Sequence, residues 1–405
     1  MADDSGKDSR RARLLVLGAS AYQIPVMRTA SRLGVEVIAL DRSDSAPGAA
    51  IADRFFALDT ADREAVARLA FAEGVDGVIA PCTDVAVPTQ AYVAAAIGAS
   101  GPTVDAAETL TDKGRFRAYQ SQRNLPRPRS VEIGIGGLDG VSLENDTYVM
   151  KPARSSGSKG IFVVEANQIA EHLRETLSYC PDGRFVVESF IPGDQGTVEG
   201  LWVDGRITLA AITERLTADV PLVATLGHLW PSHFGEDVCQ RILDAIADIF
   251  VDLRIPSSPF DCDVVVGPDG PVVLELTPRL GGNSLSKLVR AATGVDLTAE
   301  AVRLALPRSE ILLPLPSADP LGPAVGVLVL GSPTPGQLAY DPVGEAALRT
   351  EPWLAEISWD FPIGAPVRAF ANGRDRVGEA LFVAPDRATL KRRQADIVRH
   401  LKLGR

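Results

Sequence analysis

The sequence has few of the residues from which metal and redox sites are usually built. Its 405 residues include four cysteines and four histidines, and aromatic side chains make up only 6%. The cysteines (Cys82, Cys180, Cys239 and Cys262) have no CxxC spacing, which argues against a zinc site or a disulfide framework and is typical of the reducing cytoplasm. The net charge is -11 and no basic run reaches five residues, so nucleic acid is not expected as a partner.

Long apolar runs are also missing. None approaches the roughly 18 residues that a membrane-spanning helix requires, so no membrane partner is expected. The polar start of the chain predicts a disordered tail over residues 1–11. Beyond it, 46% hydrophobic and 23% charged residues are typical of folded, core-forming sequence, and the length allows two or three domains.

Strand-like and helix-like patterns alternate over residues 12–108. Apolar runs at 13–17, 35–40 and 77–81 are separated by helical patterns through Leu33, at 62–73 and at 87–97. This alternation predicts an α/β domain with a parallel sheet covered by helices on both faces. The first strand is followed by GASAYQ, which lacks the GxGxxG of dinucleotide-binding domains, so an NAD(P) oxidoreductase is the weaker interpretation.

From residue 109 the pattern changes to strands separated by glycine turns. Residues 109–312 predict an α+β body, with helices near 167–178, 235–252 and 284–305. A proline-rich stretch at 313–323 predicts a linker into a small β-rich C-terminal subdomain over 313–405, with strands expected over 324–330, 366–372 and 378–384.

One loop has the composition of a phosphate-binding loop. Arg154-Ser-Ser-Gly-Ser-Lys-Gly160 lies between two strand-like runs, and Lys151 precedes it. Small residues let backbone amides approach an anion, and lysines supply charge for phosphate. An ordinary flexible hairpin has the same composition, so the loop alone leaves both interpretations open.

Two carboxylates, Asp263 and Glu275, lie on strand-like runs joined by a Gly-Pro-Asp-Gly turn. A hairpin would bring them together as hard oxygen ligands for Mg²⁺, although both could also be solvated strand-edge acids. Arg279 follows Glu275 by four residues and leads into Gly-Gly-Asn283-Ser284. These groups together could stabilise the charge of an acyl phosphate.

These motifs, in this order, resemble the ATP-grasp superfamily over nearly the whole chain. The segment DKGRFR at 112–117 resembles the first lysine motif, YVMKP at 148–152 the second, and VESFIPG at 187–193 the adenine hinge. The resemblance implies a pre-ATP-grasp domain at 12–108, an ATP-grasp domain at 109–312, and binding of ATP and Mg²⁺. The implied ATP-binding residues are Lys113, Lys151, Ser155, Ser156, Gly157, Gly160, Glu188, Phe190, Ile191 and Gln195.

The same resemblance assigns the metal and catalytic residues. It makes Asp263, Glu275 and Thr277 the metal ligands, and Arg279 and Lys159 the catalytic residues. Two positions depart from the family pattern: Gln195 stands where a ribose-binding glutamate is usual, and Thr277 stands where a metal-binding asparagine is usual. A hydroxyl is a weaker metal ligand than an amide oxygen, so Thr277 predicts a more loosely held metal, whereas the amide of Gln195 can still form hydrogen bonds with the ribose.

The resemblance to stand-alone carboxylate-amine ligases implies a small carboxylic acid and an amino acid-like amine as substrates, and allows a homodimer. GHLWPS at 227–232 resembles the stretch over the substrate pocket of L-amino acid ligases, which gives His228 as a candidate substrate residue. Asn283 and Ser284, in the polar segment after Arg279, are the other two candidates. With its ordinary pKa near ~6.5, His228 could orient a carboxylate or act as a base. The alternatives are a bicarbonate-using carboxylase of the same fold and a catalytically impaired nucleotide-binding module.

Overall fold

The computed structural model describes residues 10–134, 143–144, 146–180, 182–307 and 323–404. Most of the expected tail at 1–11 and the expected linker up to residue 322 lie outside these residues. No helix in the described ranges is long and apolar enough to cross a membrane.

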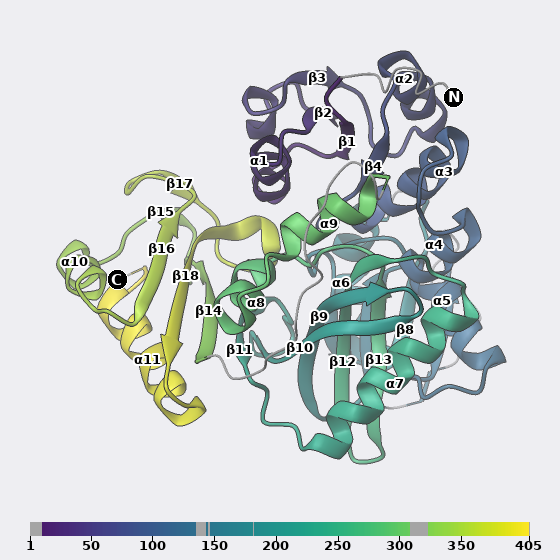
Figure 1. Ribbon diagram of the computed structural model, residues 1–405. Helices are drawn as coiled ribbons and strands as arrows, with labels where there is room; N and C mark the ends of the chain where they lie inside the picture. Colours follow the sequence, from purple (N-terminus) through teal and green to yellow (C-terminus); the bar gives the residue numbers. More distant parts are fainter. Residues whose placement is uncertain (1–9, 135–142, 145, 181, 308–322, 405) are drawn as a thin grey trace, which may run out of the picture.

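A four-stranded parallel sheet with the order β3-β2-β1-β4 begins the fold, as predicted (Figure 1). Its elements are β1 (Arg13–Leu17), α1 (Ile24–Arg32), β2 (Glu36–Asp41), β3 (Arg54–Ala57), α2 (Arg63–Glu73), β4 (Gly77–Ile79) and α3 (Val87–Ile97). Side chains alternate along β1, so Leu14 and Val16 pack with α1, whereas Leu15 and Leu17 pack with α2 and α3. The carboxyl ends of the strands face the rest of the molecule.

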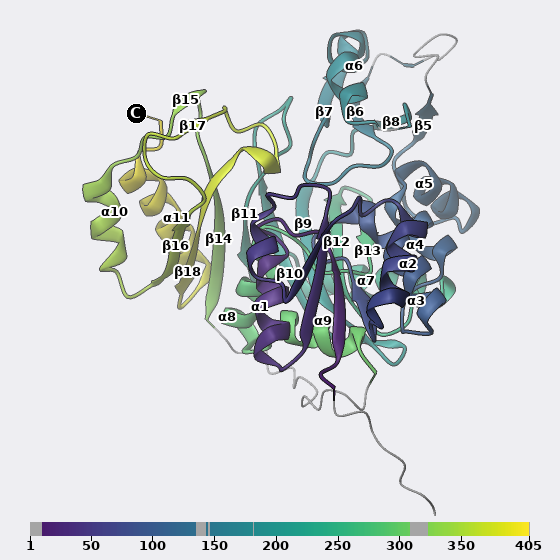
Figure 2. The same cartoon turned by 90° about the horizontal axis from the view of Figure 1, so that it is seen from above.

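Two helices, α4 (Val104–Thr111) and α5 (Lys113–Gln122), connect this sheet to a small antiparallel sheet with the order β5-β8-β6-β7. The strands are β5 (Ser130–Ile133), β6 (Thr147–Pro152), β7 (Phe162–Glu165) and β8 (Phe185–Ser189), and α6 (Ile169–Ser178) covers them. We call this part the small-sheet unit; it projects from the body of the molecule in Figure 2. The segment 154–160, here called the glycine loop, joins β6 to β7.

The body of the molecule is an eight-stranded antiparallel sheet with the order β13-β12-β9-β10-β11-β14-β18-β16. Its first five strands are β9 (Asp194–Val203), β10 (Arg206–Thr217), β11 (Thr225–Trp230), β12 (Ser258–Gly267) and β13 (Gly270–Thr277). On one face, Ile242 and Phe250 of α7 (Glu236–Asp252) pack against Phe260 of β12. Helices α8 (Leu285–Thr293) and α9 (Leu297–Ala305) follow, and α9 packs against α1 of the N-terminal sheet.

The remaining three strands of this sheet come from the C-terminal residues. They are β14 (Ala324–Gly331), β16 (Leu354–Trp359) and β18 (Arg376–Ala384), accompanied by α10 (Pro342–Arg349), α11 (Arg387–Leu401) and the short pair β15 (Gly336–Gln337) and β17 (Pro366–Val367). Because β14 pairs directly with β11, the expected C-terminal subdomain shares its sheet with the central body.

Two element predictions are wrong. The helix expected over 284–305 is two helices, because Gly294 adopts a φ of +78° that ends α8. The strand expected over 366–372 is only the two residues of β17. Strands β11 and β16 were not predicted.

Candidate active site

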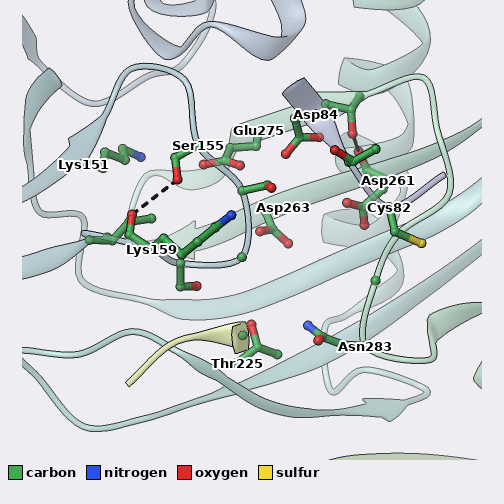
Figure 3. A pocket seen from close by; sticks show the side chains of 18 of the residues that line it. Cys82, Asp84, Lys151, Ser155, Lys159, Thr225, Asp261, Asp263, Glu275 and Asn283 are labelled. Carbon is green, nitrogen blue, oxygen red and sulfur yellow. Dashed lines mark hydrogen bonds between the residues drawn. The ribbon is translucent and has the colours of Figure 1, made fainter. Parts of the chain in front are cut away.

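A cavity of about 730 Å³ lies where the small-sheet unit, the central sheet and the N-terminal sheet meet (Figure 3). Its volume is within the range of small-molecule sites, about 300–1,000 Å³. Fifteen of the predicted site residues line it: Lys151, Ser155, Ser156, Gly157, Lys159, Glu188, Phe190, Ile191, Gln195, His228, Asp263, Glu275, Thr277, Arg279 and Asn283. Residues that are far apart in the sequence therefore share one cavity.

The end of the cavity lined by Lys151, Glu188 and Phe190 contains a buried ion pair. Lys151 Nζ lies 2.6 Å from one Glu188 oxygen, and Arg117 Nε donates to the other oxygen over 2.7 Å. Burial raises the pKa of Glu188, but Arg117 and Lys151 outweigh burial and hold this pKa below its ordinary value. Next to it, the Phe190 N–H donates to the Thr147 carbonyl over 3.0 Å. Glu188 is therefore an ionised anchor for Lys151 beside the proposed base-binding segment.

The glycine loop forms the wall next to this ion pair. Ser155 Oγ donates to the Lys159 carbonyl over 3.4 Å, and the Lys159 side chain extends toward the carboxylates (Figure 3). Burial lowers the pKa of Lys159, and Arg374 lowers it further. The Gly157 carbonyl accepts from the Gly373 N–H over 3.1 Å, so the loop contacts the C-terminal part of the chain. This arrangement supplies hydroxyls and a cation of the kind that bind phosphate.

Asp263 and Glu275 are directly opposite each other on β12 and β13. Arg215 Nη1 donates to Asp263 over 2.7 Å, and Lys113 Nζ lies 3.3 Å from Glu275. Burial raises the pKa of Glu275, but Lys113 and further cations outweigh burial and lower it to about 2. The Glu275 carboxyl is therefore ionised, and the Asp263 carboxyl opposite it adds a second set of oxygens of the kind that Mg²⁺ prefers.

The described residues contain no group of three or more His, Cys, Asp or Glu side chains placed to hold a metal. The predicted set has two carboxylates and the Thr277 hydroxyl, which donates over 3.5 Å to the Asp261 carbonyl. Mg²⁺ commonly takes one or two carboxylates and completes its shell with water and substrate phosphates. The donor set at Asp263 and Glu275 therefore fits a Mg²⁺-nucleotide better than a metal held by protein alone.

Arg279 is held by two acids that the sequence did not single out. Its Nε donates to Asp84 over 2.8 Å, a contact that its Nη2 also makes, and its Nη1 donates to Asp261 over 2.6 Å. Burial raises the pKa of Asp261 to about 6, and Glu199, its cross-strand neighbour, has a pKa raised well above the ordinary value, also chiefly by burial. The Glu199 carboxylate accepts from the Gly281 N–H over 3.0 Å. A single buried guanidinium therefore pairs with two acids, Asp84 and Asp261.

Asp84 belongs to the N-terminal sheet, since it follows β4. In parallel sheets, functional groups gather at the carboxyl ends of the strands. This rule was the available signal for Asp84 in the sequence CTDVAVP, and it also covers Asp41 and Asp59, which line the same cavity. The N-terminal sheet thus contributes directly to the site.

Three predicted site residues do not line the cavity. Lys113 lies just behind its wall and donates to the Ser155 carbonyl over 3.0 Å. Gly160 packs on α6, where a Cβ atom would lie 2.8 Å from Tyr179. Ser284 donates to Glu379 over 2.5 Å, so its hydroxyl is used within the protein.

The remaining end of the cavity is a candidate substrate region. Thr225 and Asn283 lie on the same side of it (Figure 3), and Arg215 Nε donates to the Thr225 hydroxyl over 3.0 Å. His228 of β11 pairs in register with Arg215 of β10. Trp230, two residues further on, packs against apolar clusters and does not line the cavity.

A comparison with protein-family models matches residues 145–287 to the ATP-grasp domain. The chain has an ATP-grasp domain. Among curated relatives, a formate-dependent phosphoribosylglycinamide formyltransferase from Photobacterium profundum is 24% identical and matches 93% of each chain. The enzyme of the same name from Hydrogenovibrio crunogenus is also 24% identical, over 78% of this chain and 80% of its own length.

Solved structures share the fold across the whole chain. The L-amino acid ligase from Bacillus licheniformis superposes with a TM-score of 0.80 at 19% identity, covering 97% of this chain and 98% of its own. The phosphoribosylglycinamide synthetase from Anaerococcus prevotii gives 0.74 at 17% identity, covering 97% and 99%. The ATP-grasp domain and the curated relatives confirm the expected class, an ATP-dependent ligase. Two solved structures of the same fold were determined with ADP, one of them also with Mg²⁺.

Proposed function

We propose that this protein is a carboxylate-amine ligase that forms an amide or peptide bond through an acyl phosphate and releases ADP and phosphate. One observation carries the proposal: a single cavity joins the Lys151–Glu188 ion pair, the glycine loop, the opposed Asp263 and Glu275, and Arg279. A nucleotide, its metal and a carboxylate would each meet suitable groups there.

Each part of the cavity has a role in this reaction. Lys151 and Lys159 bind the nucleotide phosphates, and the segment at Phe190 and Ile191 binds the base. Asp263, Glu275 and Thr277 would hold Mg²⁺, which, when bound, spreads the negative charge of the transferring phosphoryl group. The mechanism requires no protein nucleophile, because the substrate carboxylate attacks the γ-phosphate itself.

Arg279 lies where the activated acid would meet the amine. Asp84 and Asp261 hold its guanidinium in place, so little reorganisation is needed when charge develops on the acyl phosphate. The names of the relatives support a carboxylate paired with an amine: formate with phosphoribosylglycinamide in one case, and amino acids in the other. A small carboxylic acid and an amino acid-like amine are the substrate classes proposed here.

The test is the release of ADP and phosphate from Mg²⁺-ATP with acids and amines supplied singly and in pairs. Amino acids, small carboxylic acids, and formate with phosphoribosylglycinamide are the first pairs to measure. Release that depends on a pair supports the ligase and names its substrates. Stimulation by bicarbonate alone would assign the protein to carboxyphosphate-forming enzymes instead. ATP binding without release under any condition would favour the impaired module.

The proposal extends to a cytoplasmic location and, by analogy with related enzymes, to a homodimer. All four cysteines are free thiols, which suits a reducing compartment. Gel filtration with light scattering measures the assembly state directly.

A further inference from the structure

His228, on the central strand β11, has a buried ring nitrogen that the proposed reaction does not use. Its side chain is only 2% exposed, and it lines the cavity. Its Nε2 atom is buried and has no hydrogen-bond partner among the described residues. Leaving a buried polar atom without a partner is unfavourable, so such an atom beside a cavity is suited to a hydrogen bond from a ligand.

The contact that His228 Nδ1 makes with Thr213 determines which nitrogen of the imidazole carries the proton. Thr213 Oγ1 lies 2.9 Å from the Thr197 carbonyl, which can only accept, so the Thr213 hydroxyl proton is committed there. His228 Nδ1 lies 3.3 Å from the same Oγ1. Because this oxygen has no second proton to donate, Nδ1 must carry the hydrogen of that contact. A neutral imidazole then has an unprotonated Nε2.

The ring is neutral for two reasons. Burial lowers the pKa of His228 to about 3, and the nearby Arg215 opposes a second positive charge. Nε2 is therefore a hydrogen-bond acceptor. A carboxylate has only acceptor atoms, so the sequence-based alternative that His228 orients a carboxylate is disfavoured.

The position of His228 connects it to the rest of the site. Thr197 donates its hydroxyl to Asp263 over 2.7 Å, while its carbonyl accepts from Thr213. Glu275, Asp263, Thr197 and Thr213 are successive partners across strands β13, β12, β9 and β10. A row of polar side chains thus crosses the sheet from the two acids toward His228.

We propose that Thr213 fixes the proton of His228 on Nδ1, so that Nε2 accepts a hydrogen bond from the amino group of a substrate. This inference rests on the proposed ligase function and adds the group that recognises the amino group. The N–H donor has two sources: the α-amino group of an amino acid that is activated at its carboxylate, or the amine that attacks the acyl phosphate.

The first test needs no substrate. In ¹⁵N-histidine-labelled protein, His228 is one of four histidines and is assigned by comparison with His228→Asn. The expected spectrum has the proton on Nδ1 and does not change between about pH 5 and pH 8. In Thr213→Val the single tautomer should be lost, whereas Thr213→Ser should keep it. A proton on Nε2 in the wild type, or titration near ~6.5, would overturn the proposal.

The second test uses the matched variant His228→Asn, whose amide can keep the contact with Thr213 while the Nε2 acceptor is lost. Activation of the acid alone is measured as hydroxamate formed with hydroxylamine, using L-alanine and propionate as acids. Amide formation is measured with propionate as the acid and an amino acid as the nucleophile, so that only the nucleophile carries an amino group. In His228→Asn, kcat/KM should fall by about 10- to 100-fold either in hydroxamate formation from L-alanine or in amide formation, but not in both. The KM for ATP should not change.

The assay that shows the loss identifies which substrate donates its amino group to His228 Nε2. A loss confined to L-alanine hydroxamate assigns Nε2 to the activated amino acid, and a loss confined to amide formation assigns it to the attacking amine. Wild-type rates in both arms, or equal losses with L-alanine and propionate, would overturn the inference. A wild-type protein that releases no ADP with any pair would contradict the proposed function instead, while the tautomer measurement would still stand.

Discussion

At the scale of single residues, a substitution of Glu275 should reduce activity without unfolding the protein. Glu275 opposes Asp263 and lies 3.3 Å from Lys113, on the cavity wall. In Glu275→Gln, the proposed metal ligand is lost and Lys113 keeps an unmatched charge beside the proposed phosphate site. We expect turnover to fall by about 100-fold or more, with the fold retained. Steady-state ADP release and circular dichroism measure the two quantities.

The matched control is Glu351→Gln, which changes an exposed carboxylate away from the cavity. This variant should keep the wild-type rate. Wild-type turnover in Glu275→Gln would mean that Glu275 does not bind the metal.

His228 also predicts a pH effect on stability. Its pKa is about 3 in the folded protein and near ~6.5 when unfolded, so between these values only the unfolded chain takes up the proton. Its contribution to stability is therefore fully present above pH ~6.5 and is lost as the pH falls toward 3, by at most about 1.4 kcal/mol per pH unit. His228→Asn should lose less stability than the wild type between about pH 7.5 and pH 5.

Urea unfolding of the wild type and of His228→Asn at both pH values measures the stability that each protein loses. Groups other than His228 titrate in both proteins, so their effect cancels when the two losses are compared. His233→Asn is the control, because the His233 side chain is 37% exposed. Identical pH dependence in His228→Asn and the wild type would show that His228 is not buried as a neutral ring.

The residues of the site differ in how readily the sequence predicts them. Asp263, Glu275 and Arg279 lie within one short segment, so their spacing carries the signal. Asp84 meets Arg279 only because a separate sheet packs against the body, 195 residues away in sequence. The sequence gives Thr213 no distinguishing feature, because its contact with His228 forms only when β10 pairs with β11. Contacts of this kind depend on tertiary pairing, which a local pattern does not contain.

At the scale of elements, the glycine loop should respond to nucleotide. It joins β6 to β7, and its only described backbone contact with the C-terminal part of the chain is the Gly157–Gly373 hydrogen bond. Mg²⁺-ATP should therefore slow tryptic cleavage after Arg154 and Lys159 by ordering the loop over the phosphates. The digestion is followed by mass spectrometry, with Mg²⁺ alone as the reference.

Cleavage after Arg123, which lies at the end of α5 and does not line the cavity, is the internal control. Its rate should be the same with and without nucleotide. Equal protection at both places would point to a general stabilisation rather than to closure of the loop.

The elements themselves were predicted unevenly. Apolar runs such as those of β1, β12 and β13 are buried strands, and the pattern predicts them correctly. Strand β11 was missed because Gly227 within it and Pro231 directly after it are typical of a turn, while its partner β14 begins nearly a hundred residues later. The break between α8 and α9 depends on the left-handed backbone of Gly294, which an apolar period does not show.

At the scale of the whole molecule, the Asp84–Arg279 ion pair joins the N-terminal sheet to the central body. Both side chains are less than 10% exposed. Asp84→Asn removes one buried charge from the cluster, so the free energy of unfolding should fall by about 2 kcal/mol. Urea unfolding followed by tryptophan fluorescence measures this change.

Asp105→Asn is the comparison, because Asp105 pairs with Arg115 although its side chain is 82% exposed. Exposed pairs contribute at most about 1 kcal/mol. A loss in Asp84→Asn no larger than in Asp105→Asn would mean that the ion pair does not couple the two parts.

Because the eight-stranded sheet contains strands from both the central body and the C-terminal residues, it limits how C-terminal segments can be exchanged with those of relatives. Strand β14 covers the edge of β11 and pairs Val327 directly with His228. Deleting the residues after 323 would expose the backbone of β11 as a template for aggregation. A C-terminal segment grafted from a relative would have to reproduce this register, because β14 supports the strand that carries the candidate substrate residue. Chimeras should therefore exchange β11 and β14 as one unit.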